Sequence, residues 1–162
     1  QEDYRMFEAK TPQLDSAYAK GVSGHIAGEL RPGLLVMAGG CNFPDRPARK
    51  GGAKRYYSEI YIGEYLGAVH HACETKASEV DIWWWLIGHL PQPTAYAAFQ
   101  QYDDQLIVAG GQSAEGDLRD AYIIQLGNRH GMTITPLPSL PEPRSGMASA
   151  LIENVLYSSG VV

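Results

Sequence analysis

The residues best suited to bind a ligand concentrate in one loop that directly follows an apolar run and two glycines. Residues 41–57 read CNFPDRPARKGGAKRYY, with a formal charge of +4 in a chain whose formal net charge is −5. The charges of this loop are those of Asp45, Arg46, Arg49, Lys50, Lys54 and Arg55. Because a guanidinium binds a carboxylate at two points, the loop predicts capture of a small anion. A solvated loop that only confers solubility is the alternative.

A second loop, residues 110–122, follows a matching apolar run and places Glu115 four residues before Arg119. A positioned carboxyl group can serve as a general acid or base. The alternative is an exposed ion pair worth less than about 1 kcal/mol. Tyr96 in TAYAAF and His25 in SGHIAG begin predicted inner strands. Either side chain could line a ligand funnel or pack in the core.

Metal chemistry is not expected from this sequence. The cluster HHAC, residues 70–73, has no second Cys or His group at zinc-ligand spacing. The two cysteines, Cys41 and Cys73, could pair in an oxidising compartment or remain free thiols. The negative net charge disfavours nucleic acid as a partner, and no apolar run is long enough to cross a membrane.

An internal repeat explains how these loops would be positioned. Each copy combines a strand of small residues, a polar turn and a more apolar strand that ends on glycine. The copies are GHIAGELRPGLLVMAGG from Gly24, AYAAFQQYDDQLIVAGG from Ala95 and the degenerate GMASALIENVLYSSG from Gly146, with Ser-Ser-Gly in place of Ala-Gly-Gly. After the first two copies come an aromatic-rich strand (56–65, 120–126) and a fourth strand with a proline-bounded exit (83–93, 132–144).

The spacing and the strand count together predict the fold class. Gly40 and Gly111 are 71 residues apart, and Gly111 and Gly160 are 49 apart. A period near 50 with four strands per unit is typical of a kelch-type β-propeller. An ordinary β-sandwich with glycine-rich turns is the alternative. In a propeller, the doublets would allow close backbone approach near the axis and a turn with positive φ.

The prediction is therefore an all-β chain of about two and a half four-stranded blades, forming one partial propeller domain over residues 1–162. The blades would cover residues 21–93, 94–144 and, incompletely, 145–162. Residues 1–20 could supply an outer strand of another blade. Residues 66–82 interrupt the first blade, and their apolar spacing is compatible with a short inserted helix.

Three motifs give the chain a resemblance to a known family. They are Gly-Cys-Asn-Phe-Pro-Asp, Gly-Gly-Ala-Lys-Arg-Tyr-Tyr and Leu-Pro-Gln-Pro-Thr-Ala-Tyr. Over about residues 20–162 the chain resembles the kelch-type N-acetylneuraminate epimerases, or sialic acid mutarotases, in their cyclically permuted branch. The resemblance implies a six-bladed propeller in a periplasmic or secreted setting. It also implies interconversion of the α and β anomers of N-acetylneuraminate without a cofactor.

The resemblance also implies roles for individual residues. Glu115 and Arg119 match the pattern of a catalytic pair, although the family's own pair is expected on a different blade. Sialic acid or a related anionic sugar would be bound by Asn42, Arg46, Lys54, Arg55 and Tyr96. A non-catalytic kelch module that binds a glycan or protein is the alternative function, and an inactive fragment of the enzyme is another.

The length departs from the family pattern. Six blades of about 50 residues need about 300 residues, so a chain of 162 cannot close a ring alone. An open propeller exposes strand edges, which proteins avoid. A fragment of a longer chain, self-association and blades from a different chain all stay open.

Overall fold

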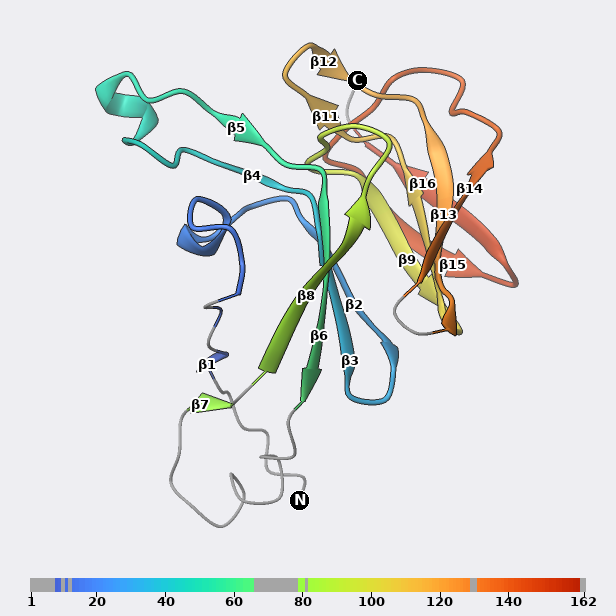
Figure 1. The fold of residues 1–162 in the computed structure, drawn as a ribbon. Helices are drawn as coiled ribbons and strands as arrows, with labels where there is room; N and C mark the ends of the chain where they lie inside the picture. Colours follow the sequence, from blue (N-terminus) through green and yellow to red (C-terminus); the bar gives the residue numbers. More distant parts are fainter. Residues whose placement is uncertain are drawn as a thin grey trace, which may run out of the picture.

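The chain forms two four-stranded antiparallel sheets and a hairpin, arranged as successive blades (Figure 1). The computed structural model describes residues 8–9, 11, 13–65, 79–80, 82–128 and 131–160. The first blade contains, in spatial order, β2 (Ile26–Arg31), β3 (Leu34–Ala38), β6 (Glu59–Tyr65) and β8 (Ile82–His89). The second contains β9 (Ala98–Tyr102), β10 (Gln105–Ala109), β13 (Ala121–Leu126) and β14 (Met132–Leu137). The hairpin is β15 (Ala148–Ile152) and β16 (Val155–Ser159). The expected all-β architecture of about two and a half blades is confirmed.

Short elements occupy the connections. Two-stranded sheets form between β4 (Cys41–Asn42) and β5 (Arg55–Tyr56), and between β11 (Gln112–Ser113) and β12 (Gly116–Asp117). Two short 3-10 helices also lie in these connections, η1 (Tyr18–Lys20) and η2 (Ala48–Lys50). A further pair of short strands, β1 (Glu8–Ala9) and β7 (Glu79–Val80), is parallel. None of the described helices is long and apolar enough to cross a membrane. Most of the predicted helical insertion at 66–82 lies outside the described residues, and so does the HHAC cluster at 70–73. The assignment of residues 1–20 to another blade stays a prediction.

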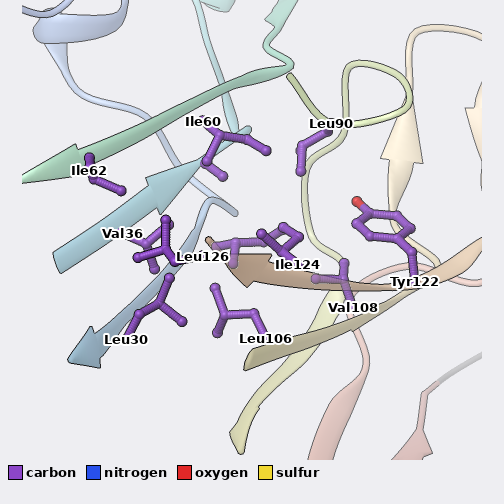
Figure 2. Close-up of a cluster of buried hydrophobic side chains, with 12 residues drawn as sticks. Leu30, Val36, Ile60, Ile62, Leu90, Leu106, Val108, Tyr122, Ile124 and Leu126 are labelled. Carbon is purple, nitrogen blue, oxygen red and sulfur yellow. The ribbon is translucent and has the colours of Figure 1, made fainter. Parts of the chain in front are cut away.

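The core lies between the facing sheets of the first and second blades (Figure 2). This core forms because side chains alternate between the two faces of each strand. In β13, for example, every second side chain, beginning with Tyr122, is buried. Burying a large aliphatic side chain stabilises a fold by about 1.5–3 kcal/mol as an upper estimate. The most deeply buried members of this core are Ile26, Val36, Ala38, Ile60, Ile62, Leu106, Val108 and Ile124.

Two consecutive glutamines of β9 connect the three blades through their first strands, which lie next to one another. The Gln101 amide accepts from the backbone N–H of Glu29 (3.1 Å) and donates to the Glu29 carbonyl. Gln100 donates instead to the carbonyl and hydroxyl of Ser149, at 2.9 and 3.1 Å. Because adjacent residues of a strand point to opposite faces, each glutamine reaches a different neighbouring blade.

The glycine doublets meet both physical requirements predicted for them. Their φ angles are positive, 62° and 95° in the first blade and 67° and 113° in the second. A β-carbon on Gly39 would lie 2.5 Å from the Thr94 carbonyl oxygen, and one on Gly110 would lie 2.5 Å from that of Arg144. Only glycine tolerates both the conformation and the approach.

The structure shifts the alignment of the third copy by one residue. Ser159 pairs with Ala148 in the hairpin, as Ala109 pairs with Ala98 in the second blade. Gly160 therefore corresponds to Gly110, the first glycine of a doublet, and not to the second. The expected match of Ser-Ser-Gly with Ala-Gly-Gly is therefore wrong by one residue, because the sequence alone does not define the strand register.

Candidate functional site

In the first two blades the first strand begins and the second strand ends at the same end of the sheet, and the segments that contain β4–β5 and β11–β12 extend from that end (Figure 1). In the first blade the Gly40 N–H donates to Thr94, Thr94 donates to Tyr57, and Tyr57 donates back to Gly40, at 2.8, 3.0 and 3.0 Å. The second blade repeats this backbone triangle with Gly111, Arg144 and Leu118. Both glycine doublets thus anchor loops of the same design, and residues 41–57 and 112–118 extend from equivalent points.

Side chains from these segments form a compact group that we call the interloop cluster, consisting of Ser23, Lys54, Tyr56, Tyr96 and Gln112. Tyr56 donates its hydroxyl to Gln112 Oε1 at 2.8 Å, and Lys54 Nζ donates to the same oxygen at 3.4 Å. The ammonium lies 5.2 Å from the centroid of the Tyr56 ring and 5.3 Å from that of Tyr96. The Tyr96 hydroxyl lies 2.9 Å from Ser23 Oγ.

The positive charge of Lys54 is favoured by this environment. Desolvation lowers the pKa of Lys54, but the Tyr56 hydroxyl and the charge interactions with Cys41, Tyr56 and Tyr96 outweigh it and raise the pKa. An ammonium near aromatic faces is stabilised by the ring quadrupole. The cluster therefore offers a permanent cation beside two phenol rings and a hydroxyl pair, which is chemistry suited to an anion with an apolar face.

Two of the predicted substrate-binding residues, Lys54 and Tyr96, meet in this cluster. Arg55 follows Lys54 but lies elsewhere, with its guanidinium carbon 4.7 Å from the centroid of the Tyr57 ring. Arg46 is exposed, and no described contact joins its side chain to the cluster. The binding roles of Arg46 and Arg55 stay predictions.

Asn42 is used for anchoring within the fold. Its amide nitrogen donates to the carbonyls of Ala17 (2.8 Å) and Gly21 (3.0 Å), and its oxygen accepts from the Tyr57 hydroxyl (2.8 Å). Tyr18 adds a 2.8 Å hydrogen bond to the Gly39 carbonyl. The segment before the first blade is thereby fastened to the root of the basic loop, and a direct contact of Asn42 with substrate stays a prediction.

Glu115 and Arg119 are both exposed near the turn between β11 and β12. The Glu115 N–H donates to Ser113 Oγ at 3.3 Å, and the Arg119 carbonyl accepts from Leu140 at 2.8 Å. No ion pair joins their side chains in the described part of the chain. Their catalytic roles stay predictions.

Sequence reasoning missed Ser23, Tyr56 and Gln112 as members of the cluster. The repeat contained a signal for one of them, since Gln112 directly follows the second doublet as Cys41 follows the first. Isolated bridges pair Ser23 with Cys41 and Ala95 with Gln112 at equivalent places. Cys41 is buried as a free thiol, and the described residues contain no group of three or more metal-ligating side chains.

Comparison with known proteins places this geometry in context. The chain is 26% identical over 105 residues to the N-acetylneuraminate epimerase of Salmonella arizonae, which covers 65% of this chain and 25% of that protein. It is 30% identical over 100 residues to the epimerase of Yersinia enterocolitica, covering 62% and 24%. The chain is a distant, partial relative of these epimerases. It matches about a quarter of their length, and no protein-family model matches it.

The fold agrees with that relationship. The solved structure of YjhT superimposes with a TM-score of 0.52 at 22% identity, covering 77% of this chain and 32% of that one. At this identity the likeness describes the fold alone. The two sheets and the hairpin therefore correspond to part of a kelch-type propeller.

Proposed function

We propose that this chain forms part of a sialic acid mutarotase that interconverts the α and β anomers of N-acetylneuraminate. The observation that carries the proposal is the interloop cluster, where the Lys54 ammonium lies 5.2 and 5.3 Å from the centroids of the Tyr56 and Tyr96 rings. The partial similarity to N-acetylneuraminate epimerases supports it. N-acetylneuraminate has a carboxylate next to its anomeric carbon, so a cation there would position the reacting centre.

Anomer exchange requires a proton to leave the anomeric hydroxyl and a proton to reach the ring oxygen. The ring opens as the anomeric oxygen becomes a carbonyl, and closes after rotation about the adjacent bond. We assign removal of the anomeric proton to the Glu115 carboxylate. Arg119 would stabilise the negative charge that develops on the ring oxygen as its bond to the anomeric carbon breaks, and the protonated Glu115 or water would supply the proton to that oxygen. The cluster would hold the carboxylate of the sugar meanwhile.

The setting of this reaction is also part of the proposal. An extracytoplasmic location, periplasmic or secreted, fits a protein that acts on free sialic acid. The remaining blades would come from further chain, from a second copy or from a different protein, since exposed edges such as that of β16 favour pairing.

A non-catalytic kelch module that binds a sialylated glycan is the second candidate. Its supporting observation is the exposure of both Glu115 and Arg119, with no ion pair between them. Binding requires only the cluster, whereas mutarotation requires an acid and a base at the anomeric centre.

Proton NMR of freshly released α-N-acetylneuraminate tests the enzymatic proposal. The decay of the α signal should be faster with the chain than in buffer at the same pH. Glu115→Gln should remove the acceleration, because an amide cannot accept the proton. The matched control Glu153→Gln changes an exposed glutamate in the turn between β15 and β16 and should retain it. If the folded wild-type chain gives no acceleration, the mutarotase proposal fails for this chain.

A further inference from the structure

Each of the three blades begins with a residue in the left-handed conformation. The residues are Gly24, Tyr96 and Gly146, with φ angles of 65°, 55° and 64°. The Tyr96 N–H donates to the Gly24 carbonyl at 2.8 Å, and the Gly146 N–H donates to the Tyr96 carbonyl at 2.9 Å. A chain of equivalent backbone hydrogen bonds thus runs from blade to blade, and only its middle position has a side chain.

A tyrosine at this position is unfavourable for the backbone. The β-carbon of an L-residue disfavours positive φ, and tyrosine has no short polar group to compensate locally. Residues kept in such conformations concentrate at functional sites, where the position of the side chain matters more than local stability. The repeat itself uses glycine on both sides, so the fold does not require tyrosine there.

The unusual backbone places the Tyr96 side chain at the junction of the first two blades. Its ring packs on Gly24, where an added β-carbon would lie 2.6 Å from Tyr96 Cδ1. Its hydroxyl lies 2.9 Å from Ser23 Oγ, and the Lys54 ammonium lies 5.3 Å from its ring centroid. Tyr96 therefore joins the two groups, since its ring lies near the Lys54 ammonium and its hydroxyl bonds with Ser23.

The cation retains hydrogen-bonding capacity for a ligand. An ammonium has three N–H donors. Among the described residues, two acceptors lie near the Lys54 ammonium, Gln112 Oε1 at 3.4 Å and the Tyr56 hydroxyl, which leaves one N–H for a ligand. The Tyr96 and Ser23 hydroxyls share one bond of 2.9 Å, and Ser23 also donates to the Cys41 carbonyl over a long distance, 3.4 Å. A ligand oxygen that replaces this carbonyl as acceptor would receive the Ser23 hydrogen, while the Tyr96 hydroxyl donates to Ser23 Oγ.

We infer that Lys54, Tyr96 and Ser23 form a subsite for the carboxylate of an acidic sugar, and that Tyr96 determines this specificity. The inference rests on the proposed function and names the groups that recognise its substrate. Lys54 and one hydroxyl donate to the carboxylate oxygens, as charge-assisted hydrogen bonds require. The phenol faces of Tyr56 and Tyr96 pack against the apolar C–H face of the sugar ring.

The test compares N-acetylneuraminate with its methyl ester, in which the same sugar has no negative charge. Isothermal titration calorimetry on the intact chain should show that the acid binds at least tenfold more tightly than the ester. Lys54→Met should abolish this preference. Lys50→Met, a change of an exposed lysine in η2 of the same loop, should leave it intact. Tyr96→Gly, which suits the left-handed backbone, should weaken binding of the acid at least tenfold.

The outcomes separate this inference from the proposed reaction. Equal affinity of wild-type chain for acid and ester, or no binding of either, would overturn the subsite. A preference that survives Lys54→Met or Tyr96→Gly would overturn the assignment of these residues. Acid-selective binding without faster anomer exchange would support the subsite while the mutarotase proposal fails. Faster anomer exchange without acid-selective binding would support the mutarotase proposal and overturn the subsite.

Discussion

Replacing Gly39 by alanine tests whether the glycine doublets exist because two backbones approach closely. The matched control is Gly51→Ala, because Gly51 also has a positive φ, 80°, but nothing lies within 4 Å of an added β-carbon there. The control measures the cost of the left-handed conformation alone, about 1–2 kcal/mol.

At Gly39 the same backbone cost applies, since φ is 62°, and a steric cost is added. The new β-carbon would lie 2.5 Å from the Thr94 carbonyl oxygen and 2.9 Å from Leu90 Cδ1. The leucine can rotate, but the carbonyl accepts the Gly40 N–H at 2.8 Å and cannot move without weakening that bond. Losing a buried hydrogen bond costs about 1–3 kcal/mol, so Gly39→Ala should destabilise the fold by about 2–5 kcal/mol.

Urea unfolding monitored by tryptophan fluorescence measures both variants. Domains of this size unfold with a free energy of about 5–15 kcal/mol, so the difference is within range of the assay. Gly39→Ala should have the lower midpoint, by at least about 1 kcal/mol in unfolding free energy relative to Gly51→Ala. Equal losses in the two variants would refute the role assigned to the close approach.

Two further predictions concern the anchoring segment and the buried tyrosines. Asn42→Ala removes three hydrogen bonds and should lower the free energy of unfolding by about 2–3 kcal/mol, measured by urea unfolding; a loss below about 0.5 kcal/mol would contradict the anchoring role. Burial raises the pKa of both Tyr18 and Tyr122 above the ordinary value of 10.0. The unfolded chain therefore loses these protons first, and stability should fall as the pH rises above about 10. Unfolding measured at increasing pH should show a weaker decline in Tyr122→Phe than in wild type, and an identical decline would be inconsistent with a protonated Tyr122 in the fold.

Much of the fold was predictable because it depends on local patterns. Alternating apolar residues define β13, where Tyr122, Ile124 and Leu126 face the core. The doublets also follow from local chemistry, since Gly39 and Gly110 both have positive φ. The register of the third copy did not follow, because a shift by one residue changes no local propensity.

The candidate site was predictable only in part. The charge pattern identified the loop that contains Lys54, and strand position identified Tyr96. The charge pattern did not distinguish Lys54 from Arg46, which is also positively charged but makes no described contact with the cluster. Lys54 directly precedes β5, which begins at Arg55, and which of the two side chains faces the second blade depends on the path of the whole loop.

The sequence by itself determined an all-β chain of repeated strands, the glycine turns between them and a basic loop on an acidic chain. These properties depend on residues close together along the chain, through side-chain alternation, backbone freedom and net charge. Only the tertiary structure decided that Lys54, Tyr96 and Gln112 meet, and that Asn42 anchors the fold. Those contacts join segments up to 58 residues apart, as in the bond between Lys54 and Gln112. The packing of one blade on the next defines the contacts of Lys54, and the path of the segment before the first blade defines those of Asn42. No local preference encodes either arrangement.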